Sequence, residues 1–594
     1  MTLVQRPALV TDRMRAVPPV LLAVLVAAVL HLLWWQFIAT SGGDIAAQDA
    51  WAEFARTHPD SAYNLAWYGG MHPVSYSVVS PYIMAQVGVR ATMILAGTLS
   101  AGLLAWLVVS RSDDKNRWVV AVYGAVALAG NALSGRVTFA LGTLFALAAL
   151  CVVFAWPRPS TSTAERWVRG GLAAGASGLA TAASPVAGAF LGLVAATLWL
   201  RRRRPAAYAL GVPPVVVVAA SALLFPFSGR QPMAWYSTIL PIAMGVAVVI
   251  LTPRSWRTVQ FGAALYVVAV VGAWLVPSPV GTNVSRLGLL FGGVVLVAAV
   301  TLGAWRSSWV GRRYGTRAAQ VLLAVALITS TTWQVAYAVR DVVSSAPPES
   351  FTSDLAPLLA QLDSRQAALA RVEVVPTKSH REAAALAPHV PLARGWNRQA
   401  DAERNPLFYR DRPPLTARAY HHWLHRWAVG YVVLSTSATP DPAAAQEAEL
   451  VASAPPYLVR VWSDDDWVLY HVRDATPLVT PPAQVVSYDA AQLTIRTPGP
   501  ARVVVRIADS PWLSLVDADG ETLPSAESSD GAGAVAGPEA QACLSSLAAE
   551  LPQESSRSLR DNWLVLHAPA AGTYRIAAPY KLPRGSTCPT APED

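Results

Sequence analysis

The stretch VPPVLLAVLVAAVLHLLWWQFIA, residues 17–39, decides the fold class of this chain. It is an apolar run of more than 20 residues, long enough to cross the hydrocarbon core of a bilayer as a helix. Arg6, Arg13 and Arg15 precede it, and Trp34-Trp35 stands near its end, where a signal peptide would carry small residues before a cleavage site. The run therefore predicts a membrane-spanning helix and not a cleaved signal peptide.

The apolar character continues far beyond this first run. The chain has 594 residues, of which 53% are hydrophobic and only 14% charged, whereas about a quarter of the residues in a soluble protein are charged. Residues 17–339 are apolar between short Arg-rich breaks, and residues 340–594 have an ordinary polar composition. This division predicts a helical polytopic membrane domain, residues 1–340, followed by soluble domains.

The membrane part contains one stretch that is too long for one span and too short for two ordinary ones. Residues 170–200 are interrupted at Ser184-Pro185, so two short helices with both ends on one side are expected there. The other expected spans lie at about 17–39, 91–110, 118–134, 137–156, 207–225, 236–252, 261–276, 287–304 and 318–339.

The distribution of basic residues predicts the orientation of these spans. With the interrupted stretch counted as two helices, nineteen Lys and Arg residues fall before the first span and in alternate connections, and five fall in the others. The positive-inside rule then gives eleven helices in the cell membrane, a cytoplasmic N-terminus and an extracytoplasmic C-terminal part. The formal charge of +9 lies in these short clusters, so membrane lipids are expected partners and nucleic acid is not.

The first outer loop, residues 41–89, carries several candidate site residues. Short interfacial helices are expected over residues 49–56 and 76–87. Asp44 follows the first span, where it can act as a general base that faces a membrane-lined cavity, or simply cap a helix in solvent. Asp49 and His72 are polar partners available in the same loop.

Two outer-end arginines extend this candidate site. Arg136 begins one expected span and Arg286 begins another. Each guanidinium can bind a phosphate in a bidentate way. Alternatively, each arginine can be an interfacial residue whose charged end extends to the lipid headgroups. Together with Asp44 they outline a site that activates a hydroxyl and holds an anionic leaving group.

This pattern resembles the GT-C superfamily of membrane glycosyltransferases that depend on polyprenyl-phosphate sugars, of actinobacterial type. The residues that carry the resemblance are SGGDIAAQD, residues 41–49, and WYGGMHPVSY, residues 67–76, in which His72-Pro73 is similar to the His-Pro element of some members. The resemblance implies a GT-C-like helical domain in which Asp44 is the catalytic carboxylate, with Asp49 as its rival. The adjacent pair of acids common in the superfamily is absent, so the need for a divalent metal stays open.

The activity that the resemblance implies is transfer of a hexose or pentose, with inversion, from a polyprenyl-phosphate donor to a cell-envelope glycan, lipid or protein acceptor. Two rivals remain: a transporter or flippase of lipid-linked glycans, and a noncatalytic membrane protein that binds the cell wall. No inverted repeat is visible in the sequence and charges within the spans are few, which disfavours a transporter.

The C-terminal part reads as two domains. Residues 341–475 alternate between strand-like and helix-like pieces and predict an α/β domain, whereas residues 476–594 predict a β-sandwich of the kind that can bind carbohydrate. Arg394, Trp396 and Arg398 can form an edge that stacks on a sugar and contacts an anion, or they can pack and cap the α/β domain. The Ser/Gly/Ala-rich stretch 524–538 predicts a flexible loop.

Three cysteines complete the sequence evidence. Cys151 lies in an apolar run and reads as a small buried residue. Cys543 and Cys588 can form a disulfide if the C-terminal part faces an oxidising compartment, the alternative being two free thiols.

Overall fold

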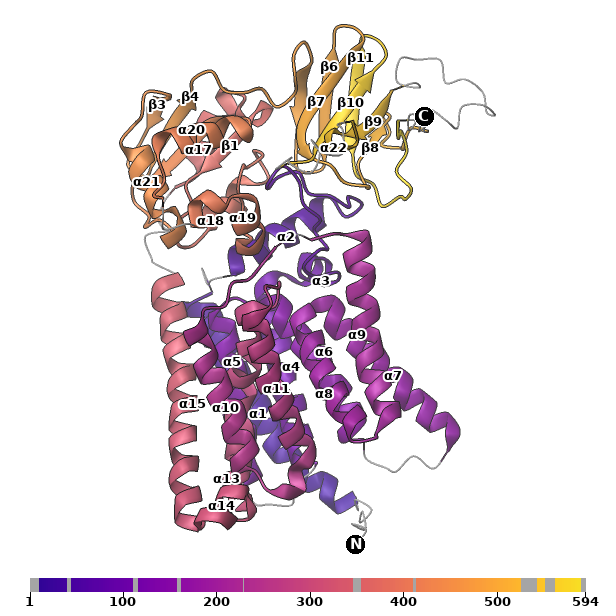
Figure 1. Ribbon diagram of the computed structural model, residues 1–594, viewed down its shortest axis with the longest axis vertical. Helices are drawn as coiled ribbons and strands as arrows, with labels where there is room; N and C mark the ends of the chain where they lie inside the picture. The colour runs from indigo at the N-terminus through magenta and orange to yellow at the C-terminus, as the bar shows by residue number, and fades with distance from the viewer. Residues whose placement is uncertain are drawn as a thin grey trace. The chain divides into compact units, whose positions relative to one another are not determined.

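The computed structural model describes residues 10–39, 44–110, 116–156, 162–227, 229–345, 354–409, 413–524, 542–550 and 561–588. The expected flexible loop at 524–538 therefore lies outside the described residues after its first position. The chain forms two compact units, coloured along the sequence in Figure 1. The first, here called the helical unit, comprises residues 1–48 and 74–346, and the second, the C-terminal unit, comprises residues 49–73 and 347–594.

Long helices build the helical unit, and each expected span is found as a helix or as a run of consecutive helical turns. Their bounds are α1 Val10–Phe37, α4 Val89–Val109, α5 Arg117–Leu133, α6 Val137–Phe154, α7 Thr163–Ala183, α8 Pro185–Leu200, α9 Arg204–Leu224, α10 Ile239–Leu251, α11 Arg257–Leu275, α12 Ser285–Leu287, α13 Gly293–Thr301, α14 Trp309–Tyr314 and α15 Thr316–Ser345. Among the described residues, 7 helices are long and apolar enough to cross a membrane, and shorter apolar helices accompany them. The helical unit is thus that of a multi-pass membrane protein.

The interruption at Ser184-Pro185 separates α7 from α8, as the sequence predicts. Pro185 is the first residue of α8, where its missing N–H costs little. The last carbonyls of α7 are satisfied from the segment before the short helix α3, Ser80–Val87: the Ser77 hydroxyl donates to Ala183 O at 2.8 Å and the Val78 N–H donates to Ala182 O at 2.7 Å. These hydrogen bonds hold the tip of the α7–α8 hairpin beside residues 77 and 78 of the first outer loop.

The C-terminal unit begins with a mixed sheet. Its strands are β1 Arg371–Val374, β2 Val429–Ser435, β3 Leu458–Ser463 and β4 Trp467–Val472, in the order β1-β2-β4-β3. Strand β1 pairs with β2 in parallel, and the other pairs are antiparallel. The accompanying helices are α17 Ala356–Ser364, α18 Arg381–Leu386, α19 Arg398–Arg404, α20 Ala417–Arg426 and α21 Ala445–Ala452, so this region is the α/β arrangement expected from the sequence.

Two antiparallel sheets follow, again as expected. One has the order β7-β10-β9 and the other β5-β6-β11-β8, and Figure 1 shows them layered in the upper part of the view. Their strands are β5 Gln484–Tyr488, β6 Gln492–Thr497, β7 Ala501–Ala508, β8 Ser514–Val516, β9 Cys543–Ser546, β10 Trp563–Ala568 and β11 Gly572–Ala577. Alternate side chains of β7 are buried, the pattern of a strand with one face on a core.

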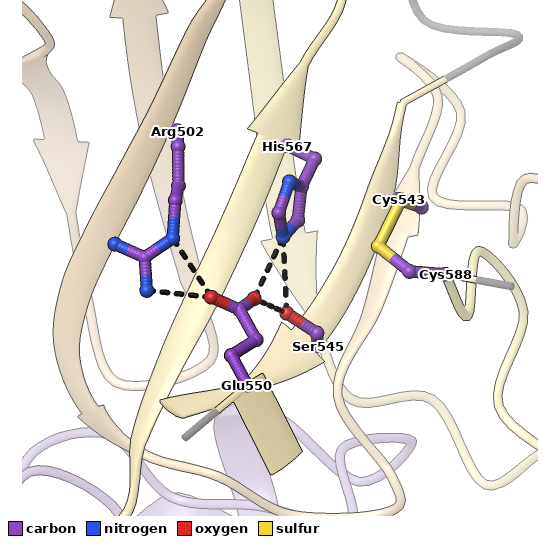
Figure 2. Close-up of a disulfide and its surroundings, with 6 residues drawn as sticks. All are labelled: Arg502, Cys543, Ser545, Glu550, His567 and Cys588. Atoms are coloured by element: carbon purple, nitrogen blue, oxygen red, sulfur yellow. Dashed lines mark hydrogen bonds and ion pairs between the residues drawn. A yellow bond between two sulfur atoms is a disulfide. The ribbon is translucent and has the colours of Figure 1, made fainter. Parts of the chain in front are cut away.

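A disulfide and a polar cluster stabilise one edge of the β7-β10-β9 sheet. Cys543, the first residue of β9, is bonded to Cys588 (Figure 2). Nearby, the Glu550 carboxylate on the short helix α22, Leu547–Glu550, accepts hydrogen bonds from Arg502 Nε at 2.7 Å and from Ser545, and lies 2.7 Å from His567 Nε2. The cluster ties α22 to the faces of β7 and β10.

Part of the first outer loop is built into the C-terminal unit. Residues 61–73, here called the threaded segment, follow helix α2, Ile45–Thr57, and run through this unit. Trp67 Nε1 donates to Ala383 O at 3.1 Å and the Tyr68 hydroxyl donates to Gly395 O at 2.7 Å, while the Leu65 N–H donates to Ala490 O at 2.8 Å. The threaded segment thereby contacts both the α/β region and the antiparallel sheets.

Candidate active site at one end of the helical unit

Asp44 lies between α1 and α2. Its carbonyl accepts the Gln48 N–H at 3.1 Å, so the residue begins α2, and its own N–H donates to Ser134 O at 3.2 Å. Its side chain is 41% exposed, and Oδ2 lies 3.9 Å from Arg136 Nε. Asp44 therefore begins α2, as the helix-capping interpretation expects, and its partly exposed carboxylate faces a cation. Its role as a general base stays a prediction.

The turn between α5 and α6 positions Arg136. Gly135 has φ +67°, the left-handed conformation that glycine adopts without strain, and its N–H donates to Ala132 O at 2.9 Å, which ends α5. The Asn131 side chain then donates to Arg136 O at 3.2 Å. This turn holds Arg136, 19% exposed at its side chain, against Asp44.

Arg286 lies on α12 and is buried. Its guanidinium carbon is 5.0 Å from the centre of the Phe139 ring, and Nη1 makes no hydrogen bond to any described residue. It interacts electrostatically with Arg136, Asp44 and the Tyr76 hydroxyl. Two neighbouring cations therefore lie in the helical unit, and Nη1 of Arg286 is a buried donor without an acceptor among the described residues.

A cavity is lined by both arginines, although Asp44 is not among its lining residues. Its empty volume is about 370 Å³, counting the part open to solvent. Its lining residues are Ala127, Gly130, Asn131, Ser134, Arg136, Arg286, Leu289, Leu290, Gln334, Tyr337, Ala338 and Asp341. Asp341, near the end of α15, is buried and accepts a hydrogen bond from the Ser134 hydroxyl, so the carboxylate that lines this cavity is that of Asp341.

A smaller cavity adjoins the first one. Its empty volume is about 250 Å³, and it shares Asn131 and Leu290 with the larger cavity. Apolar side chains such as Met93 and Phe139 line it together with His31, whose Nδ1 is 2.7 Å from Ala27 O within α1. The site thus continues from a charged outer part into a mainly apolar part among the helices.

The structure brings together Asp44, Arg136 and Arg286 of the expected residues, but His72 is a structural residue. It belongs to the C-terminal unit, where it is buried, with Nδ1 3.0 Å from Ala62 O and Nε2 3.4 Å from the Ser510 hydroxyl. Burial lowers the pKa of His72 to about 4. Asp49, half-buried in α2, also belongs to that unit.

Arg394 corrects another expectation, because its guanidinium is not available to an external anion. The side chain is 3% exposed and lies 2.8 Å from Asp401 Oδ2 and 2.7 Å from Glu447 Oε2, with Glu373 Oε1 at 3.5 Å. Burial and the adjacent Glu447 carboxylate hold the pKa of Glu373 well above its ordinary value. Arg394 is the central cation of a buried ionic cluster, the packing role that the sequence left as the alternative.

One face of the Trp396 indole is covered by a histidine ring and is not available to stack on a sugar. Its ring lies 3.5 Å from the His380 ring and nearly parallel to it, and the Arg398 guanidinium carbon is 5.3 Å from its centre. Arg398 in turn binds Asp441 at 2.7 Å. These contacts favour a packing role for Trp396 as well.

Several residues of the cavity were not identified from the sequence. Asp341, Gln334 and Asn131 line it from segments far apart in the chain, and Tyr76 interacts with Arg286 without lining it. Asp341 carries a detectable signal, since it is a carboxylate at the end of the last apolar run, as Asp44 is just beyond the first. In the part of the chain that the structure describes, no group of three or more His, Cys, Asp or Glu residues is arranged to hold a metal ion.

Comparison with known families and curated proteins gives limited information. The family described as a domain of unknown function (DUF8823) matches residues 480–593, which is less than half of the chain. No curated protein matches the chain.

Several solved structures are similar in fold. An arabinofuranosyltransferase, AftD from Mycobacteria, is 15% identical with a TM-score of 0.44, and the match covers 77% of this chain and 42% of that one. An oligosaccharyltransferase from Archaeoglobus fulgidus is 10% identical with a TM-score of 0.42, covering 71% of this chain and 69% of that one. ArnT from Cupriavidus metallidurans is 16% identical with a TM-score of 0.40, covering 77% and 98%. The chain thus spans less than two thirds of the length of AftD.

Proposed function

We propose that this chain is a membrane glycosyltransferase of GT-C type that moves a sugar from a polyprenyl-phosphate donor to a cell-envelope acceptor. The observation that carries the proposal is the buried Arg286, whose Nη1 has no hydrogen-bond partner among the described residues, in a cavity it shares with Arg136. The Asp44 carboxylate lies 3.9 Å from Arg136. A base and an anion site are therefore adjacent, which is the combination that transfer from a phosphate leaving group requires.

In the proposed reaction Asp44 accepts the proton of the acceptor hydroxyl while that oxygen bonds to the anomeric carbon of the donor sugar. The bond between this carbon and the phosphate oxygen breaks, and the lipid phosphate leaves with the electron pair. Arg136 and Arg286 neutralise its charge. Attack from the face opposite the phosphate inverts the anomeric centre. Because phosphate is already a good leaving group, positioning and charge neutralisation supply most of the acceleration.

The disulfide supports the proposed setting. The Cys543–Cys588 bond suits an oxidising compartment, consistent with a cytoplasmic N-terminus and an extracytoplasmic C-terminal part. In this proposal residues 1–340 form the catalytic membrane domain, and residues 341–475 and 476–594 form outer domains that face the acceptor.

The test is mass analysis of cell-envelope glycans in a deletion strain complemented with variants. We expect Asp44→Asn and Arg286→Gln to be inserted at wild-type levels and to leave the glycan change of the deletion uncorrected. Arg230→Gln, which alters an arginine outside the cavity lining, should restore the glycan. Full restoration by Asp44→Asn would eliminate Asp44 as the base, and an unchanged glycan profile in the deletion strain would remove the transferase proposal.

A further inference from the structure

Helix α20, in the C-terminal unit, carries three histidines in the sequence ARAYHHWLHR, residues 417–426. His421 and His425 are four residues apart, so both lie on one face of the helix, one turn apart. Their Nε2 atoms face each other at 2.9 Å. The neighbouring His422 is exposed and lies one position away along the helix.

Contacts around the two rings fix their orientation. His425 Nδ1 lies 2.8 Å from the Thr476 hydroxyl. The His421 ring is stacked on Tyr457, with ring centres 4.2 Å apart, and the Tyr457 hydroxyl donates to Ala417 O at 2.9 Å. When His425 Nδ1–H donates to Thr476, its Nε2 lone pair is free for another partner, as in metal-bound histidines whose second nitrogen is hydrogen-bonded.

The separation of the two nitrogens suits one kind of metal coordination. Imidazole nitrogens bind first-row transition metals at about 2.0–2.1 Å, so two nitrogens 2.9 Å apart subtend about 90° at a shared ion. A tetrahedral pair would need roughly 3.3–3.4 Å at the same bond length. An angle near 90° is that of adjacent positions in tetragonal sites, which Cu²⁺ and Ni²⁺ prefer.

We propose that His421 and His425 form a surface site for a divalent transition metal of tetragonal preference, with Cu²⁺ as the best fit. Both rings are partly exposed, so an ion can reach them from solvent. The proton that bridges the two Nε2 atoms moves to Nδ1 of His421 when the ion takes its place. Because no third His, Cys, Asp or Glu completes a ligand group in the described part of the chain, water fills the remaining positions.

One neighbouring carboxylate favours a cation there. Asp474 interacts electrostatically with His425, and its carboxylate partly offsets the charge of the ion. The site is independent of the proposed transferase chemistry, since its residues belong to the C-terminal unit.

The experiment is a Cu²⁺ titration of the tag-free full-length protein in lipid nanodiscs, followed by electron paramagnetic resonance. We expect one saturable ion per chain, with a tetragonal spectrum that shows coupling to two imidazole nitrogens. His421→Asn and His425→Asn should each lose one coupled nitrogen and the saturable binding, whereas the matched control His422→Asn should bind as the wild type does. Thr476→Val should weaken binding about 10–100-fold, because it removes the hydrogen bond behind His425. Mg²⁺ should not compete.

The wild-type titration alone can overturn the proposal. A spectrum with fewer than two coupled nitrogens, or no saturable binding, would do so, as would His422→Asn losing binding to the same extent as His425→Asn. Thermal unfolding gives a second measurement, since an ion that binds only the folded chain raises its melting temperature. We expect that rise for the wild type and its absence in the His421→Asn, His425→Asn double variant.

Discussion

The Ser134 hydroxyl, in the turn between α5 and α6, donates a hydrogen bond to the Asp341 carboxylate near the end of α15. The carbonyl of the same serine accepts the Asp44 N–H at 3.2 Å. One turn therefore ties together the residue that follows the first long helix and the last helix of the helical unit. The two carboxylates of the candidate site are held by the same short segment that carries Arg136.

Removal of the Asp341 carboxylate should destabilise the helical unit. In Asp341→Ala the buried Ser134 hydroxyl loses its acceptor, which costs about 1–3 kcal/mol in the free energy of unfolding. Asp341→Asn should cost less, since its side-chain carbonyl still accepts the bond. Thermal unfolding in nanodiscs, monitored by tryptophan fluorescence, measures both. Ser110→Ala, which removes an exposed hydroxyl, is the control and should change little.

Acid should destabilise the C-terminal unit through His72. The pKa of its folded-state ring is about 4 and its ordinary value is 6.5, so between these pH values the unfolded chain binds a proton that the folded chain does not. Stability therefore falls by about 3 kcal/mol as the pH drops from above 6.5 to below 4. Urea unfolding at a series of pH values should show this decrease in the wild type and a smaller one in His72→Asn. An equal decrease in both would assign the effect to other groups.

The ionic cluster around Arg394 should be sensitive to loss of its cation. Arg394→Met leaves Asp401 and Glu447 buried without a counter-charge, and we expect a loss of about 3–5 kcal/mol in the stability of the C-terminal unit. The control is Arg56→Met, which breaks an exposed ion pair with Glu53 and should have little effect. Circular dichroism during urea unfolding compares the two. Similar losses in both variants would contradict the structural role of Arg394.

A side chain at Gly395 should clash with the threaded segment, which packs against this glycine. A Cβ at this position would lie 2.2 Å from the indole of Trp67, a fully buried ring that cannot move aside. Gly395→Ala should therefore destabilise the C-terminal unit by about 1–3 kcal/mol or more through overpacking. Gly499→Ala, where a Cβ meets nothing within 4 Å, is the matched control in the same unit. Protease resistance of the folded protein distinguishes them.

The sequence predicted the fold well where one physical requirement dominates. Apolar runs long enough for a bilayer predicted helices α1, α4–α13 and α15. The break at Pro185 predicted the α7–α8 hairpin, because proline cannot continue a helix. Alternating apolar residues gave the strands of the antiparallel sheets, such as β7. These features depend on local patterns that the chain displays within one element.

The candidate site was predictable only in part, because its cavity depends on contacts between distant elements. Arg136 and Arg286 were identified since each follows a polar turn at the start of an apolar run. Asp341 was missed because nothing local shows that Ser134 lies against it. The surroundings of His72 and Arg394 could not be predicted for the same reason: their partners Ser510 and Glu447 are 438 and 53 residues away in the sequence.

The threaded segment also has a consequence for biogenesis. Its hydrogen-bond partners include Ala383, Ala490 and Ala578, so the segment is synthesised long before the residues that enclose it. Between 316 residues (Trp67 to Ala383) and 516 residues (Ala62 to Ala578) separate the segment from these partners. At about 5–20 residues per second this is an interval of roughly 15–100 s. During that time Trp67 and Tyr68, both fully buried in the finished molecule, have nothing to enclose them. If a ribosome stalled late in the message, the helical unit would already be synthesised while Trp67 and Tyr68 were still exposed. Exposed aromatic side chains of this kind are recognised by chaperones and quality-control proteases.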